Sequence, residues 1–337
     1  MAKANERKIM DRDLGLELAR VTETAAIGCA KWMGRGDKNA ADQAAVTGMR
    51  KMFETVNIDG VVVIGEGEKD EAPMLYIGEE IGIAGPDSDK VDIAVDPLDG
   101  TTSTAKGIAN AISVIAIGQR NHLFHTKNYY MEKMAVGPKA KGAIDLNKPL
   151  KENLTNVAKA LNKSVEELTV TILERDRHKD LIAQCREAGC RVKLFRDGDV
   201  GAAISTCYDD SGVDMLVGIG GCPEGVLAAA ALKCLGGEIQ GRLHAHTSEE
   251  IKQSQTDPHY YDILTTDDLA KGDDVMFIAT GVSDGDMLKG VRYMGGNKIK
   301  THTVVMRSAS GTIRFIEAIH DMNRKPSYAQ NDGKEVK

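Results

Sequence analysis

Helix-like and strand-like segments alternate along most of this 337-residue chain. Apolar residues at helical spacing predict two opening helices, over residues 14–33 and 40–56. Short β-rich runs, each closed by glycine, proline or aspartate, predict strands over residues 61–64, 91–95, 112–117 and 131–136. The first part of the chain should therefore be an α+β half.

From about residue 151 the alternation becomes regular. Predicted helices cover residues 153–161, 178–188 and 224–235, and predicted strands cover 168–173, 191–195 and 215–219. This order is typical of a layered α/β half. Three more strand-like runs, at 275–280, 303–307 and 312–318, should add to an existing sheet. We predict an N-terminal half over residues 1–150, a C-terminal half over 151–324 and a polar tail over 325–337.

Composition limits the classes of partner. Hydrophobic residues make up 42% of the chain, enough for a large core, and 43 basic against 50 acidic residues give a net charge of -7. Such a surface does not attract nucleic acid or an anionic membrane as a whole. An anionic substrate would therefore need local cations.

Cysteine usage and the N-terminus both predict a cytoplasmic protein. Six cysteines occur without a C-x-x-C pair, which fits reduced, buried thiols. The first 13 residues are charged and lack the apolar stretch of a signal peptide.

The segment richest in potential chemistry is DPLDGT at residues 96–101, which directly follows the apolar run at 91–95. Proline should end the ladder pairing of that strand, and Gly100 permits a tight backbone. Asp96 and Asp99 can then converge as hard oxygen ligands for Mg²⁺ or Mn²⁺, beside the hydroxyl of Thr101. An ordinary turn also fits D-P-x-D-G, and the motif alone does not decide between the two.

Further acids that could complete a metal site lie far apart in the chain. Asp42 is expected in the first turn of the second helix, and Glu66 lies between glycines after a strand. Glu224 follows a glycine-rich strand-to-helix turn at 218–223, whose backbone N–H groups could also hold a phosphate. Acids favoured at helix N-termini would explain Asp42 and Glu224 equally well.

Candidate contacts for an anionic sugar are scattered in the same way. Guanidinium groups suit phosphate oxygens, and the candidates for phosphate and sugar contacts are Lys38, Tyr130, Arg175 and Arg177. A surface salt-bridge cluster is the alternative for the arginine pair. Asp197 and Asp199 could bind sugar hydroxyls, or could simply form a turn.

Several competing signatures fail. The G-x-G beginning at residue 218 is broken by Pro223, so the dinucleotide fingerprint is incomplete. The chain has no G-x-x-x-x-G-K-[ST] loop, no G-x-S-x-G elbow and no H-E-x-x-H pair. Nucleotide hydrolases, serine hydrolases and zinc metalloproteases of these types are disfavoured.

The DPLDGT segment resembles the D-P-[IL]-[DE]-G-T signature of the inositol monophosphatase and fructose bisphosphatase superfamily. Four further stretches, at residues 34–42, 64–76, 130–133 and 220–226, resemble the class II fructose-1,6-bisphosphatases of bacteria. The resemblance runs from about residue 14 to residue 320.

This resemblance implies an α/β sugar-phosphatase fold of alternating α-β-α-β-α layers, with the metal site in the N-terminal half and the sugar-phosphate site completed by the C-terminal half. Implied metal ligands, for Mg²⁺ or Mn²⁺, are Asp42, Glu66, Asp96, Asp99 and Glu224. Substrate contacts are expected from Lys38, Asp99, Gly100, Thr101, Tyr130, Arg175, Asp176, Arg177, Asp197, Asp199 and Gly221.

The implied reaction is hydrolysis of the 1-phosphate of fructose 1,6-bisphosphate to fructose 6-phosphate and phosphate, a step of gluconeogenesis. The metals would lower the pKa of the attacking water. Thr101 and Asp99 are the expected catalytic residues: the threonine hydroxyl, a weak base, would orient the water and pass its proton to a neighbouring carboxylate.

The exact substrate is left open by the sequence. Many class II enzymes have glutamate where this chain has Asp99 and lysine where it has Arg175. Similar enzymes of photosynthetic bacteria also accept sedoheptulose 1,7-bisphosphate. Two further functions fit the same residues, namely an inositol-type monophosphatase and a non-catalytic sugar-phosphate sensor. The expected assembly is a homo-oligomer, a dimer or tetramer.

Overall fold

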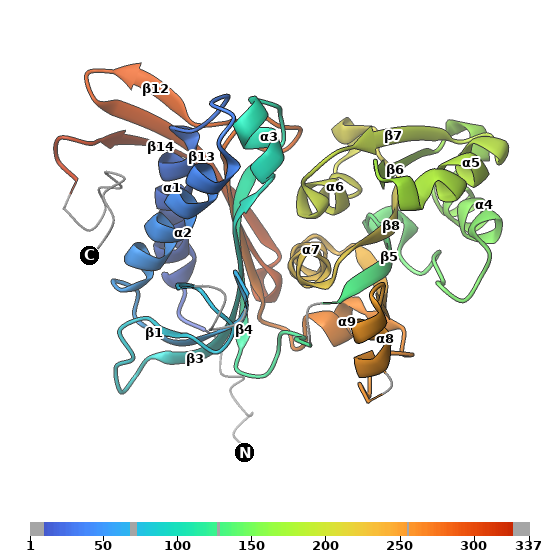
Figure 1. Ribbon diagram of the computed structural model, residues 1–337, viewed down its shortest axis with the longest axis horizontal. Coiled ribbons are helices and arrows are strands. Elements are labelled where there is room, and N and C mark those ends of the chain that lie inside the picture. The colour runs from blue at the N-terminus through green and yellow to red at the C-terminus, as the bar shows by residue number, and fades with distance from the viewer. Residues whose placement is uncertain (1–9, 68–72, 127–128, 255, 326–337) are drawn as a thin grey trace, which may run out of the picture.

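Two helices with a buried apolar face open the chain, as the residue spacing predicts: α1 spans Leu14–Ala30 and α2 spans Lys38–Phe53. The computed structural model describes residues 10–67, 73–126, 129–254 and 256–325 (Figure 1). The predicted tail at 325–337 lies outside these ranges apart from Lys325.

A first sheet packs against these two helices. Within the described chain it has eight strands in the order β12-β13-β11-β4-β3-β1-β2, and β14 pairs with β13. The strands are β1 Ile58–Ile64, β2 Glu80–Ile81, β3 Asp89–Asp99, β4 Ile112–Gln119, β11 Met276–Gly281, β12 Arg292–Gly295, β13 Lys298–Arg307 and β14 Thr312–Asp321. The last strands of the chain thus add to the first sheet, which confirms that prediction.

A second sheet has six strands in the described chain, in the order β10-β9-β5-β8-β6-β7. These strands are β5 Tyr130–Val136, β6 Thr169–Leu173, β7 Arg191–Phe195, β8 Met215–Gly221, β9 Glu238–His244 and β10 Leu264–Thr265. Because β5 belongs to this sheet while β11 to β14 belong to the first, the chain passes between the sheets more than once. The division at residue 150 stays a prediction.

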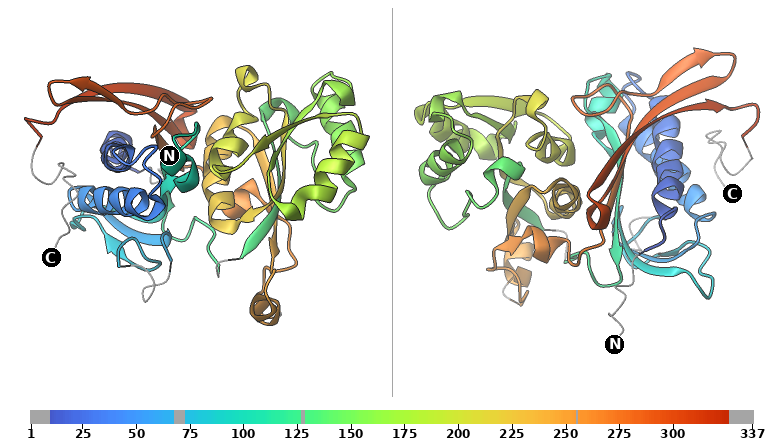
Figure 2. Two further views of the ribbon diagram at one scale, coloured as in Figure 1. Left: turned by 45° about the horizontal axis from the view of Figure 1, so that its top comes forward. Right: turned by 180° about the vertical axis from the view of Figure 1, so that it is seen from behind.

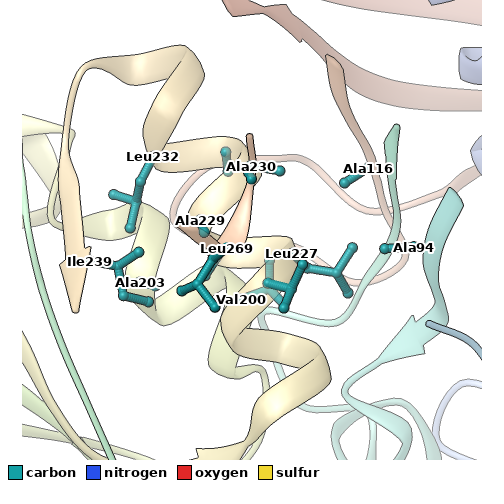
Figure 3. Packing of buried hydrophobic residues seen from close by; sticks show 14 of the residues in the cluster. Ala94, Ala116, Val200, Ala203, Leu227, Ala229, Ala230, Leu232, Ile239 and Leu269 are labelled. Carbon is teal, nitrogen blue, oxygen red and sulfur yellow. The ribbon is translucent and has the colours of Figure 1, made fainter. Parts of the chain in front are cut away.

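The two sheets are separated by a layer of helices, with α7 (Cys222–Leu235) at its centre (Figure 2). This helix is apolar on nearly all sides, as a helix buried on all sides must be. Its side chains pack against Ala94 and Ala116 of the first sheet and Ile239 of the second (Figure 3). Shorter helices complete this layer and the loops: α3 Thr101–Lys106, α6 Asp199–Ser205, α8 Ser248–Ser254 and α9 Thr266–Leu269.

On the far face of the second sheet lie α4 (Leu150–Ala160) and α5 (Lys179–Glu187), which cover a separate apolar cluster. The order through the molecule is therefore helices, sheet, helices, sheet, helices (Figure 1). The predicted α-β-α-β-α layering is confirmed. None of the helices in the described ranges combines the length and the apolarity needed to span a membrane. All six cysteines are free, and five are buried.

Two local expectations are wrong. Pro97 does not end β3: pairing with β4 resumes at Asp99, with a register shift between Asp96 and Asp99. A bulge accommodates the proline, because a bulged residue needs no ladder donor. Asp42 lies in the second turn of α2, not the first, because the helix begins at Lys38 with Asp37 as its N-cap.

Candidate active site

A cavity of about 640 Å³ opens between the two sheets where several strands end. Its walls come from the residues after β1, β3, β6, β7 and β8, together with the first turn of α7 and part of α8. Strand ends place short polar loops next to one another, and such edges of α/β sheets are common ligand sites.

All but two of the predicted site residues line this cavity. The lining residues among them are Asp42, Glu66, Asp96, Asp99, Gly100, Thr101, Tyr130, Arg175, Arg177, Asp197, Asp199, Gly221 and Glu224. Residues separated by up to 182 positions in the sequence are thus brought to one site, from Asp42 to Glu224.

Lys38 and Asp176 do not reach the cavity, and these two substrate-contact predictions are not supported. Lys38 is the first residue of α2 and is exposed. Asp176 begins a 3-10 turn, points to solvent and pairs with Lys179 at 3.0 Å. Its two neighbours in the chain, Arg175 and Arg177, line the cavity instead.

The loop after β3 is fixed by a backbone that only glycine adopts easily. Gly100 has φ +108°, and a Cβ there would lie 3.0 Å from the Cα of Ala111. Helix α3 begins directly afterwards, with Thr101 as its first residue. Asp197 accepts hydrogen bonds from the backbone N–H groups of Thr102 (3.0 Å) and Ser103 (3.3 Å). Asp197 therefore holds the start of the helix that carries Thr101.

Three buried acids that line the cavity, Asp96, Asp99 and Glu224, hold their protons more tightly than exposed carboxylic acids do. Burial raises the pKa of Asp96, and the neighbouring carboxylates of Asp99 and Glu224 raise it further. Burial likewise raises the pKa of Asp99 and of Glu224. Such a cluster is stable at neutral pH only with protons or cations among its oxygens.

Asp42 and Glu66, which also line the cavity, behave in the same way. Burial raises the pKa of Asp42, and burial followed by the charge of Asp42 raises the pKa of Glu66 to about 7. Burial thus makes all five of these cavity carboxylates reluctant to ionise.

Two buried oxygens of this cluster, Asp99 Oδ2 and Glu224 Oε2, have no hydrogen-bond partner among the described residues. Among those residues, no three histidine, cysteine, aspartate or glutamate side chains lie close enough to hold a metal ion as they stand. The donors are nevertheless all carboxylates, the type that hard divalent cations prefer, and they surround one cavity. The residues present therefore fit Mg²⁺ or Mn²⁺.

Gly221 allows the carboxylate of Glu224 to approach the backbone. A Cβ at Gly221 would lie 1.8 Å from Glu224 Oε2. The expectation that the N–H groups of residues 218–223 are open to a phosphate is not met at Ile219, Cys222 or Pro223. The N–H of Ile219 donates to His178 Nε2 at 2.8 Å, the N–H of Cys222 donates to the carbonyl of Tyr129 at 3.0 Å, and proline has no N–H.

A stack of side chains forms another part of the wall. The guanidinium of Arg177 lies over the Tyr130 ring, 4.8 Å from its centroid, and the His246 ring stacks on Tyr130 at 4.2 Å. His246 pairs with Glu250 at 2.9 Å. Sequence reasoning missed His246 and Glu250, which lie in a stretch without a recognised motif, although both line the cavity.

The raised pKa values predict how stability depends on pH. Glu66 binds its proton more tightly in the folded chain, with a pKa of about 7, than a glutamate with the ordinary value of 4.5. The unfolded chain therefore releases this proton first, and the free energy of unfolding should fall as pH rises from 4.5 to about 7. We expect Glu66→Gln to flatten this part of the curve in chelator-treated protein, measured by urea unfolding at several pH values. Parallel curves for parent and variant would contradict the assignment.

The chain is similar over most of its length to proteins of one described family. The family model described as "Bacterial fructose-1,6-bisphosphatase, glpX-encoded" matches residues 12–320. The "Fructose-1,6-bisphosphatase 1 class 2" of Escherichia coli K12 is 49% identical over 332 residues, covering 94% of this chain and 97% of that protein. Proteins named "Fructose-1,6-bisphosphatase class 2" from Escherichia coli O6:H1 and Shigella flexneri show the same identity and coverage. On this evidence the chain belongs to the bacterial, glpX-encoded family of fructose-1,6-bisphosphatases.

Proposed function

We propose that this chain is a phosphoric monoester hydrolase that converts fructose 1,6-bisphosphate to fructose 6-phosphate and phosphate, as part of gluconeogenesis and carbohydrate metabolism. The observation that carries the proposal is the lining of one cavity, to which five carboxylates and two arginines all contribute. A bisphosphate needs both kinds of group, because the phosphate that is retained must be bound without the groups that act on the phosphate that leaves.

At the reacting end, the chain's carboxylates would hold the cations, and the candidates are Asp42, Glu66, Asp96, Asp99 and Glu224. When bound, Mg²⁺ or Mn²⁺ would offset the phosphate charge and acidify water for in-line attack. Thr101 would orient the attacking water through its hydroxyl, and a neighbouring carboxylate such as Asp99 would accept the proton. Asp197 would keep Thr101 in place by holding the start of α3.

At the other end, the chain's own cations would bind the distal phosphate. Two N–H groups of Arg177, on Nε and Nη2, donate to the carbonyl of Ile219 at 3.0 and 2.7 Å. A guanidinium has five N–H donors, so three remain for phosphate oxygens. Neither Arg175 nor Arg177 pairs with a described carboxylate, since their acidic neighbours Glu174 and Asp176 pair with other cations. This weakens the salt-bridge alternative.

We expect Arg177→Ala to raise KM for the bisphosphate by about 10- to 100-fold with a smaller change in kcat, since a charge-assisted bond of about 1.5–3 kcal/mol would be lost in both ground and transition states. Selectivity over a monophosphate should shrink in proportion. The measurement is kcat/KM for both substrates in the parent, in Arg177→Ala and in the control Arg191→Ala, whose residue lies on β7 outside the cavity. An unchanged ratio in Arg177→Ala would remove Arg177 from the substrate site.

Several finer points belong to the same proposal. We place the chain in the inositol monophosphatase and fructose bisphosphatase superfamily on its DPLDGT segment, and we expect a dimer or tetramer acting in the cytoplasm. Sedoheptulose 1,7-bisphosphate is the second candidate substrate. Its sugar is one carbon longer, and the volume of the cavity would admit it.

The experiment that tests the function is phosphate release from a panel of substrates. The panel contains fructose 1,6-bisphosphate, sedoheptulose 1,7-bisphosphate, fructose 6-phosphate and inositol 1-phosphate, each with Mg²⁺ and with Mn²⁺. We expect the fructose bisphosphate to be hydrolysed at the 1-position and both monophosphates to react poorly. Faster release from inositol 1-phosphate would favour the monophosphatase alternative, and binding of the bisphosphate without turnover would favour the sensor.

A further inference from the structure

A buried lysine contacts two residues that line the cavity. Lys133 of β5 is 3% exposed and is the only lysine among the buried residues of the described chain. Its Nζ donates to Asp199 Oδ2 at 2.5 Å and to the carbonyl oxygen of Gly221 at 3.1 Å. A buried ammonium is costly unless it is paired in this way, so the arrangement requires both partners.

The two partners belong to different elements that line the cavity. Asp199 is the first residue of α6, and Gly221 is the last residue of β8. Both line the cavity, whereas Lys133 does not. Lys133 therefore connects two groups that face the ligand while remaining behind them.

The Asp199 carboxylate is held by one oxygen only. Oδ2 accepts from Lys133, and no hydrogen bond joins Oδ1 to another described residue. A carboxylate fixed through one oxygen keeps the lone pairs of the other for a hydroxyl donor. In a cavity for a sugar phosphate, the matching donor is a sugar hydroxyl.

The backbone beside this pair leaves no room for a side chain. A Cβ at Gly220 would lie 2.1 Å from Asp199 Oδ2 and 3.1 Å from Lys133 Nζ. The glycine is thus required by the ion pair, and replacing it would displace the pair without changing any charge.

Lys133 also changes the charge balance of the acidic wall, the part of the cavity lining formed by Asp96, Asp99 and Glu224. Burial alone would lower the pKa of Lys133, but the charges of Asp199 and Glu224 hold it above its ordinary value. The lysine in turn lowers the pKa of Glu224, against the effect of burial. A positive charge so close must weaken the attraction of this wall for further cations.

We propose that Lys133 is a positioning residue for the substrate: it holds Asp199 so that the free carboxylate oxygen meets a sugar hydroxyl, and its charge moderates cation binding at the acidic wall. The substrate part of this inference rests on the proposed function.

The test uses Lys133→Met, Gly220→Ala, Asp199→Asn and the double variant Lys133→Met/Asp199→Asn. We expect Lys133→Met and Gly220→Ala each to raise KM for fructose 1,6-bisphosphate by about 10-fold or more, with kcat changed less. The double variant should have the KM of Asp199→Asn within about 3-fold, because Lys133 acts through that carboxylate. The proposal would be overturned if Lys133→Met raised KM as much in the Asp199→Asn variant as in the parent. An unchanged KM in Gly220→Ala would overturn it as well.

A matched control is available at Lys163, which pairs with Asp214 at 2.6 Å away from the cavity. Lys163→Met should leave KM unchanged. If Lys133→Met alone does not unfold cooperatively, the double variant and Gly220→Ala decide the question, because neither leaves a lone charge buried.

Mn²⁺ binding separates this inference from the proposed function. Calorimetric titration of the substrate-free protein with Mn²⁺ at pH 8.5 should show tighter binding in Lys133→Met, by about 3-fold or more. General damage to the site would weaken Mn²⁺ binding and raise KM together, and that result would overturn the positioning role. If the parent does not hydrolyse fructose 1,6-bisphosphate, the proposed function fails. The effect of Lys133 on cation binding is then judged separately, and unchanged or weaker Mn²⁺ binding in Lys133→Met would overturn it.

Discussion

Removal of divalent cations should reduce the hydrolysis of fructose 1,6-bisphosphate to the background rate. The physical reason is the clustering of five carboxylates around one cavity, in which two buried oxygens have no partner among the described residues. Such an assembly repels a phosphate dianion unless cations lie between them. Phosphate release after exhaustive chelation, followed by addition of Mg²⁺ or Mn²⁺, measures the effect.

A pair of variants makes this prediction sharper. Glu224→Gln should weaken the Mn²⁺-dependent rise of the melting temperature, because a charged cavity ligand is lost. Glu23→Gln is the matched control: Glu23 is also buried with a raised pKa, but it hydrogen-bonds to Thr301, away from the cavity. Full activity of the chelated parent, or equal Mn²⁺ responses in both variants, would contradict the assignment of the carboxylates.

The layers of the fold could be predicted from the sequence because their apolar periods are strong. The strand-like run at 91–95 and the apolar helix at 224–235 are both found, since burial on both faces leaves a continuous apolar pattern. Helices α3 and α6 were not predicted. They have six and seven residues, too few to show a period, and each begins after a glycine in the left-handed region, which a sequence presents simply as a turn.

The site was predictable only where its chemistry coincides with a motif. Thr101 and Glu224 could be named because they follow recognisable strand ends. Lys133 could not be assigned a role, since it lies inside a strand and its partner Asp199 is 66 residues away. A contact between residues so far apart in the sequence depends on the packing of α6 against the second sheet, which no local pattern encodes.

The largest effect of a single substitution is expected at Thr101. Thr101→Ala should lower kcat by about 10²-fold or more and leave KM nearly unchanged, as expected for the loss of a group that orients the attacking water and helps to pass its proton to a carboxylate in the transition state. Thr101→Ser keeps the hydroxyl and should retain part of the rate. Steady-state kinetics on fructose 1,6-bisphosphate with saturating Mg²⁺ measures all three proteins.

The structure explains why this effect should be chemical and not a loss of folding. Thr101 is half-buried at the cavity, and its hydroxyl makes no hydrogen bond to another described residue. Asp197 holds the start of α3 through the backbone N–H groups of Thr102 and Ser103, which the substitution leaves intact. Thr102→Ala is therefore the matched control, with the same change one residue further along the helix and outside the cavity lining. Equal rates for Thr101→Ala and Thr102→Ala would show that Thr101 only shapes the turn, and another group would then have to orient the water.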